Sequence, residues 1–255
     1  MHFTFLGTGT STGVPTIGCH CRVCESSDPR DKRTRCSALI ESDNTRILID
    51  CGPDFRQQII HREFKKIDAV LLTHIHYDHV TGLDDLRPFA QLGDIEVYAN
   101  EGTIEGLHHS VPYFFAEHLY PGVPKMNFHV AEPYKTIMIG DIPVMPLVVY
   151  HDKLPIYGYR FGDNFAYITD MRTIDEESEK HLQGIKTLVV NALRFSPEHH
   201  SHQSVAQAIE FIRRIGAQHT YLIHSCHHIG LHAEVNKMLP HDIEMAYDGM
   251  EIDVF

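Results

Sequence analysis

The stretch LLTHIHYDHVTG at residues 71–82 places three histidines and an aspartate within six positions, directly after an apolar run. In an extended strand, side chains two residues apart point the same way, so His74 and His76 can face one point. Asp78 and His79 follow on the next turn and can reach a second point beside it. A mixed set of histidines and carboxylates suits zinc, iron or manganese better than magnesium or calcium. The stretch therefore predicts a metal centre at the end of a strand.

The composition is that of a folded protein with an excess of histidine. The chain has 255 residues and is 43% apolar, which is enough for one hydrophobic core in a single domain over residues 1–255. Its 21 histidines nearly equal its 22 lysines and arginines, which favours metal binding. The net charge of -12 makes a nucleic acid or an anionic membrane an unexpected partner.

The cysteines and the first residues indicate a reduced compartment. Three of the six cysteines lie within residues 19–24, which is not the spread of a disulfide framework. The opening MHFTFLGTGTSTG has no basic region, and its apolar run is too short for a signal peptide. No stretch approaches the length of a membrane span. We therefore expect a cytoplasmic protein that does not cross a membrane.

Short apolar runs alternate with helical patterns along the chain. The runs that end in turn residues predict strands at 3–7, 37–42, 46–52, 68–74, 95–99, 142–150, 156–161, 165–169, 187–191, 220–224 and 243–247. The clearest helical pattern is SVAQAIEFIRRIG at 204–216, and two further helices are expected over 101–109 and 230–239. This mixture predicts an α/β protein whose sheets are covered by helices.

Side chains that can bind metals follow several of these predicted strands: Asp50, His74, His151, Asp170 and His224. Strand ends at one edge of a sheet are where loops gather to build a site. The spacing along the sequence alone does not establish that they meet.

Several motifs together resemble the metallo-β-lactamase superfamily. HIHYDH at 74–79 matches its H-x-H-x-D-H signature, and ILIDCG, VVYHD, YITD and YLIHSCHH are similar to its other motifs in the same order. The resemblance implies an αββα sandwich, with two mixed β-sheets flanked by helices. It implies that Asp50 orients a metal ligand or a loop without itself binding the metal. It also implies the ligands of two divalent metals (zinc, manganese or iron): His74, His76 and His151 for one metal, Asp78, His79 and His224 for the other, and Asp170 as the bridge.

A second cluster lies in GCHCRVC at residues 18–24, within a loop at about 18–25. Cys19, Cys21 and Cys24 offer three thiolates, one ligand short of a closed tetrahedral zinc site. Such a closed site is structural rather than catalytic. A redox pair of Cys21 with Cys24, or three idle thiols, is the alternative interpretation.

The fourth ligand must come from elsewhere in the chain. The cysteine loop resembles that of PhnP-type phosphodiesterases, which carry a histidine just beyond the last catalytic ligand, and this resemblance implies His227. Cys226 and His228 are neighbours that could replace it. The prediction is one structural zinc in addition to the two active-site metals.

A third histidine cluster lies in EHHSHQSVAQ at residues 198–207, at the start of the predicted helix. Ser201 or Ser204 could cap that helix, and a helix N-terminus attracts anions such as phosphate. By resemblance to PhnP-type enzymes, His200 would protonate the leaving oxygen. His202 instead matches the position of a histidine in RNase Z-like relatives. An exposed loop of three histidines without a catalytic role is the third interpretation.

These observations together favour a metal-dependent hydrolase, most simply a two-metal phosphodiesterase. A metal-bridging hydroxide would attack the phosphorus of a small phosphodiester, such as a cyclic ribose phosphate or a nucleotide, and the catalytic residues would be His200 or His202 together with Asp78. Three alternatives stay open: an RNase Z-like tRNA-processing nuclease, a thioester or lactam hydrolase, and a non-hydrolytic binding or biosynthetic protein similar to the PQQ carrier. The oligomeric state is open too, with a homodimer as the common default.

Overall fold

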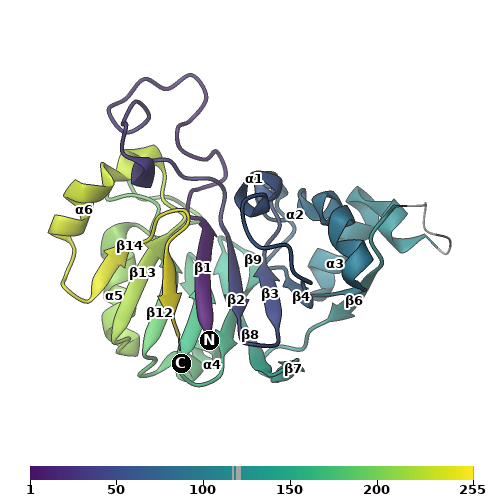
Figure 1. Ribbon diagram of the computed structural model, residues 1–255. Helices are drawn as coiled ribbons and strands as arrows, with labels where there is room; N and C mark the ends of the chain where they lie inside the picture. The colour runs from purple at the N-terminus through teal and green to yellow at the C-terminus, as the bar shows by residue number, and fades with distance from the viewer. Residues whose placement is uncertain (117, 119–121, 255) are drawn as a thin grey trace.

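Two β-sheets pack face to face and carry helices on their outer faces (Figure 1). The computed structural model describes residues 1–116, 118 and 122–254. Buried side chains from both sheets, among them Phe3, Ile49, Tyr159 and Ile223, form one apolar cluster between them. The predicted αββα sandwich of mixed sheets is therefore confirmed.

The first sheet is antiparallel on one side and parallel on the other. Strands β15, β1, β2 and β3 pair antiparallel, whereas β3, β4, β5 and β6 pair parallel. In order across the sheet the strands are β15 (Glu251–Asp253), β1 (His2–Gly7), β2 (Ser37–Glu41), β3 (Arg46–Ile49), β4 (Ala69–Leu71), β5 (Ile95–Ala99) and β6 (Met126–Val130).

The second sheet repeats this division. Strands β11, β8, β9 and β10 pair antiparallel, and β10, β12, β13 and β14 pair parallel. In order they are β11 (Thr173–Ile174), β8 (Ile142–His151), β9 (Leu154–Phe161), β10 (Phe165–Ile168), β12 (Thr187–Asn191), β13 (His219–Ile223) and β14 (Ile243–Met245), with β7 (Ile137–Ile139) paired to β8. The parallel halves bring several strand ends to one edge of the sandwich.

The helices cover the outer faces. They are α1 (Phe55–Ile59), α2 (Tyr77–Val80), α3 (Glu101–Ser110), α4 (Glu176–Leu182), α5 (Val205–Ile215) and α6 (His232–Met238). Helix α5 begins where Ser204 and Gln207 form a reciprocal cap, and it ends at Gly216 in the left-handed conformation (φ 69°). Its apolar face packs on the second sheet, as the sequence pattern predicts. Among the described residues, none of the helices is long and apolar enough to cross a membrane.

Strands β3 and β4 both end before the sequence predicts, β3 at Ile49 instead of residue 52, and the early end of β4 concerns the site. The apolar run predicts a strand over 68–74, but β4 ends at Leu71. Beyond it the chain turns toward the second sheet, where the carbonyl of Thr73 accepts a hydrogen bond from the Tyr157 amide at 2.9 Å. The histidine motif therefore starts between the two sheets rather than on the first one.

Candidate metal centre

Three candidate site residues adopt a backbone conformation that such residues rarely take. Asp50, Asp170 and His224 follow β3, β10 and β13, and their φ angles are 55°, 56° and 56°. The left-handed region is unfavourable for residues other than glycine, and it persists only where the surrounding structure imposes it. Such strain is concentrated at functional sites, and here it occurs at three strand ends at once.

The structure brings all seven predicted active-site ligands together. Ligand atoms that lie within 4.8 Å of one another form three overlapping groups: His74 with His79 and Asp170, Asp78 with His79 and His224, and His151 with Asp170 and His202. His76 joins them through its ring, whose centroid is 4.5 Å from that of His74 and 5.1 Å from that of His151. The residues come from distant parts of the chain, so the tertiary fold creates the cluster.

Several nitrogens in this cluster are buried without a hydrogen-bond partner. Within the described part of the chain they include Nε2 of His74, Nε2 of His79 and both ring nitrogens of His224. Asp170 lies between them, with Oδ1 at 3.0 Å from His224 Nε2 and Oδ2 at 3.4 Å from His79 Nε2. Leaving buried polar atoms unpaired is costly unless something else satisfies them. Free nitrogens around a shared carboxylate fit a pair of divalent metal ions.

Asp50 orients two of these histidines without facing the cluster itself. Its Oδ2 accepts hydrogen bonds from His79 Nδ1 at 2.7 Å and from the Thr73 hydroxyl at 2.9 Å. The oxygen of that hydroxyl lies 2.9 Å from His74 Nδ1. Because the hydroxyl already donates its proton to Asp50, His74 Nδ1 must be the donor in this second bond. Both rings are thereby fixed with Nδ1 as the hydrogen-bond donor, which leaves Nε2 as the atom that would bind a metal after losing any proton it carries. Sequence analysis missed Thr73; the signal available was its place between the strand and the first histidine.

The ring of His151 is oriented in a similar way, by backbone groups. Its Nδ1 donates to the carbonyl oxygens of Asp170 at 2.9 Å and Ser201 at 3.1 Å. The other ring nitrogen is left free to act as a ligand. Sequence reasoning also missed these two carbonyl groups, because only the fold brings residues 151, 170 and 201 together.

The charges in the site keep the carboxylates ionised. Burial alone would raise the pKa of Asp170, but the histidines around it hold that pKa well below its usual value. Burial alone would lower the pKa of His79, but the carboxylates of Asp50 and Asp170 raise it well above its usual value. Negative charge is therefore available at the centre to compensate divalent cations.

The two candidate proton donors lie in different surroundings. His202 is buried, with Nδ1 at 3.7 Å from Asp170 Oδ1, and its ring is 4.6 Å from those of His151 and His224. Burial, reinforced by His224, lowers the pKa of His202 to about 2. The side chain of His200 is exposed, and its ring centroid lies 4.4 Å from that of His199, with the two rings tilted. Sequence reasoning preferred His200, whereas the geometry places His202 within the cluster.

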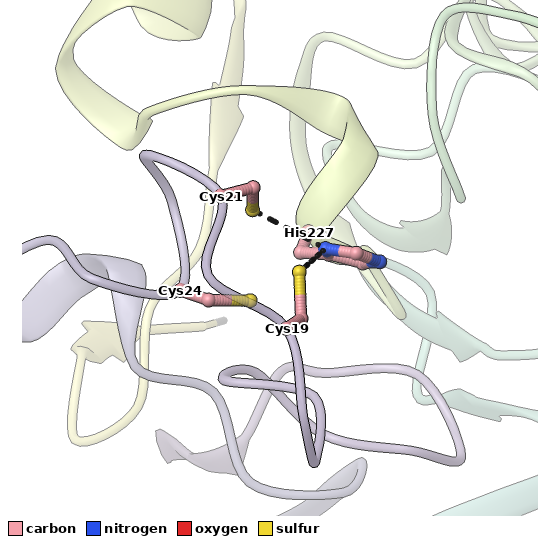
Figure 2. Close-up of side chains that lie close together, drawn as sticks. All are labelled: Cys19, Cys21, Cys24 and His227. Carbon is pink, nitrogen blue, oxygen red and sulfur yellow. Dashed lines mark hydrogen bonds between the residues drawn. The ribbon is translucent and has the colours of Figure 1, made fainter.

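The cysteine loop forms a second cluster outside the first. Sγ of Cys19 and Sγ of Cys21 lie 3.2 Å and 3.3 Å from Nδ1 of His227, and Cys24 completes a group within 4.8 Å (Figure 2). The backbone amide of Cys24, together with His227, lowers the pKa of Cys21 to about 6, and burial raises the pKa of Cys24 to about 11. Three sulfurs and one nitrogen at these separations fit a tetrahedral zinc ion.

This second cluster joins distant segments of the chain. The cysteines lie in the long loop between β1 and β2, and His227 begins the short 3₁₀ helix His227–Ile229, three residues after His224. Within the described residues, the group of metal-binding side chains contains His227 and neither of the alternatives, Cys226 and His228. A metal here would tie the loop to the segment that carries the last active-site ligand.

Comparison with known proteins identifies the family. A profile described as beta-lactamase superfamily domain matches residues 45–225, which contain all seven predicted ligands. The chain belongs to the metallo-β-lactamase superfamily. A crystal structure described as a new diphosphatase from the PhnP family is 39% identical, with a TM-score of 0.91 over 100% of this chain and 96% of that one. The resemblance to the PhnP family is therefore confirmed at the level of sequence and structure.

Two further relatives are similar over only part of their length or only in fold. An octanoyltransferase of Porphyromonas gingivalis is 46% identical over 252 residues, which are 98% of this chain and 51% of that protein. The chain thus spans about half the length of that relative. Zinc-bound PqqB from Methylobacterium extorquens has a TM-score of 0.82 at 20% identity, over 99% of this chain and 100% of that one, and shares the fold.

Proposed function

We propose that this protein is a metal-dependent phosphodiesterase that hydrolyses small phosphodiesters, cyclic or open-chain. The observation that carries the proposal is the set of unpaired histidine nitrogens around Asp170, an arrangement that would suit a pair of divalent cations. When bound, two such cations lower the pKa of a water molecule and neutralise charge on phosphate oxygens. The similarity to a diphosphatase supports phosphorus rather than carbon as the centre attacked.

In this proposal some residues would bind the cations and others would orient those that bind them. His74, His76 and His151 would hold one cation, and Asp78, His79 and His224 the other, with Asp170 between them. Asp50 and Thr73 would keep the imidazoles of His79 and His74 in the binding tautomer.

The proton donor in this proposal is His202, with His200 as the alternative. His202 Nδ1 is buried and unpaired among the described residues, and it lies beside Asp170, so it can reach a leaving oxygen held in the cluster. In the free protein the low pKa of His202 keeps its ring neutral, so the negative charge of a bound phosphodiester would have to raise that pKa before the ring could donate a proton. An exposed side chain such as His200 would reach that oxygen only after a rearrangement of the loop.

The test combines metal analysis with turnover. We expect three metals per chain by mass spectrometry and hydrolysis of bis(p-nitrophenyl) phosphate that depends on added zinc or manganese. His74→Ala and Asp170→Ala should each remove active-site metal and activity, whereas His219→Ala, a surface histidine beside Glu244, should change neither. Full activity in either of the first two variants would refute the proposal.

A second candidate is hydrolysis of an acyl thioester, and one observation favours it. The Porphyromonas gingivalis relative is named for the transfer of octanoyl groups, although about half of that protein lies outside the match. Two-metal sites of this kind can also polarise a carbonyl group. Octanoyl-coenzyme A and bis(p-nitrophenyl) phosphate should therefore be compared on the same preparation; a higher kcat/KM for the thioester would favour the second candidate.

A further inference from the structure

A cavity of about 350 Å³ lies against the predicted metal centre and has no role in the mechanism above. Its walls come from the segment after β4, from the start of α3, and from strands β8 and β9 with the hairpin between them. Its apolar lining consists of Ile75, Val148, Leu154, Pro155 and Tyr157. A volume of this size is at the lower end of the range for small-molecule sites.

The cavity shares its walls with the metal ligands. His74 lines it directly, and Ile75 lies between His74 and His76 in the chain. Leu154 is paired across the β8–β9 hairpin with His151. A substituent on a phosphate group bound at this cluster would therefore lie beside the cavity.

Most polar side chains at the cavity are already hydrogen-bonded or repel anions; the Tyr157 hydroxyl, for example, donates to the Ala131 carbonyl at 2.9 Å. The side-chain oxygen of Asn100 accepts the Thr103 amide at 2.7 Å, and its nitrogen donates to the Pro155 carbonyl at 3.4 Å. Glu101 is exposed at the rim and places a carboxylate there. A nucleobase needs hydrogen-bond partners when it is buried, and a charged group would meet the carboxylate. A neutral aliphatic group needs no hydrogen-bond partner and is not repelled by the carboxylate, so it fits this lining best.

We propose that this cavity binds an unbranched aliphatic chain on the ester oxygen that stays with phosphorus, so that the substrate is an alkyl-bearing phosphodiester. The inference rests on the proposed phosphodiesterase function and names its substrate class. Each buried methylene contributes ~0.8 kcal/mol, which is about a fourfold change in kcat/KM. The dependence on chain length continues until the cavity is full.

The test uses methyl, butyl and octyl p-nitrophenyl phosphates. Hydrolysis forms one P–O bond from water, breaks the bond to p-nitrophenolate, and leaves the alkyl phosphate and one proton. In the wild type, kcat/KM should rise from the methyl to the octyl ester. Gly102→Leu should fill the cavity, because a side chain there meets only the Asn100 side-chain oxygen at 3.7 Å, and leucine favours the helix. The readout is the octyl-to-methyl ratio of kcat/KM, which should fall at least tenfold.

Ala233→Leu is the matched control, since it adds the same side chain at the second position of α6 and is exposed. Its octyl-to-methyl ratio should equal that of the wild type. Calorimetric binding of n-octyl phosphate and methyl phosphate provides a second readout that needs no turnover. The octyl compound should bind more tightly to the wild type, and Gly102→Leu should remove the difference.

The outcomes separate this inference from the proposed function. Metal-dependent hydrolysis with a flat chain-length series would overturn the cavity proposal and leave the phosphodiesterase intact. No hydrolysis of any diester, together with octyl-selective binding that Gly102→Leu abolishes, would overturn the phosphodiesterase and keep the aliphatic site. A higher kcat/KM for a phenyl or nucleoside ester than for the octyl ester would show that the cavity binds an aromatic group, and would also overturn the cavity proposal.

Discussion

Replacing Asp50 by asparagine should weaken active-site metal binding and turnover, although the residue does not point at the metals. Asp50 Oδ1 accepts the Thr73 amide at 2.8 Å, so in the variant the amide oxygen will keep that bond. The amide nitrogen will then face His79 Nδ1 and the Thr73 hydroxyl, which both donate to Oδ2 in the native protein. To avoid a clash of donors, His79 must move its proton to Nε2, the atom that would bind metal.

The magnitude follows from the bond that is lost. A hydrogen bond to a charged group contributes about 1.5–3 kcal/mol, which corresponds to about 10- to 150-fold in metal affinity. That range agrees with the ~10–100-fold effect usual for residues that orient metal ligands. The assay is competition with a chromophoric chelator, followed by turnover of bis(p-nitrophenyl) phosphate at saturating metal.

A matched control separates orientation from general damage to the core. Asp248 is also a buried carboxylate, but its oxygens accept hydrogen bonds from the backbone and hydroxyl groups of Thr8 and Thr34. Asp248→Asn should therefore lower the free energy of unfolding and leave active-site metal affinity unchanged. Thr73→Val is a second probe that removes the hydroxyl and keeps the shape. The reasoning is wrong if folded Asp50→Asn binds metal within about twofold of the wild type.

Three further predictions concern the second cluster and the proton donor. Cys21→Ser should lose one zinc per chain and lower the Tm, because structural zinc contributes directly to folding; an unchanged zinc content would exclude this site. After zinc is chelated, Cys21 should react with iodoacetamide above pH about 6, because its thiolate forms there. Cys24, with a pKa of about 11, stays protonated and should react more slowly. Peptide mass spectrometry measures both rates, and faster labelling of Cys24 than of Cys21 would contradict the prediction. His202→Ala should lower kcat about 100-fold or more with normal metal content, whereas His200→Ala should lower it less than fivefold; the opposite pattern would reassign the proton donor.

Much of the fold was predictable because it depends on local patterns. The strands carry apolar runs with turn residues at their ends, and the helix at 204–216 carries both its cap and its glycine stop. The short elements α1, α2, α4, β6, β7, β11 and β15 were missed, since none has a periodic pattern long enough to stand out. The early end of β4 was missed because the local sequence does not show that Thr73 bonds to the other sheet.

The sequence by itself determined the family and the candidate ligands, because the spacing of the H-x-H-x-D-H motif and the order of the later motifs do not require coordinates. Which residues meet was decided by the tertiary structure. Only there does Asp50 reach His79 through a bond across 29 positions, and only there is His202 buried beside Asp170 while His200 is exposed. The physical reason is that hydrogen bonds and burial depend on distances in space, which parallel strand ends from two sheets create and which no local stretch of the chain encodes.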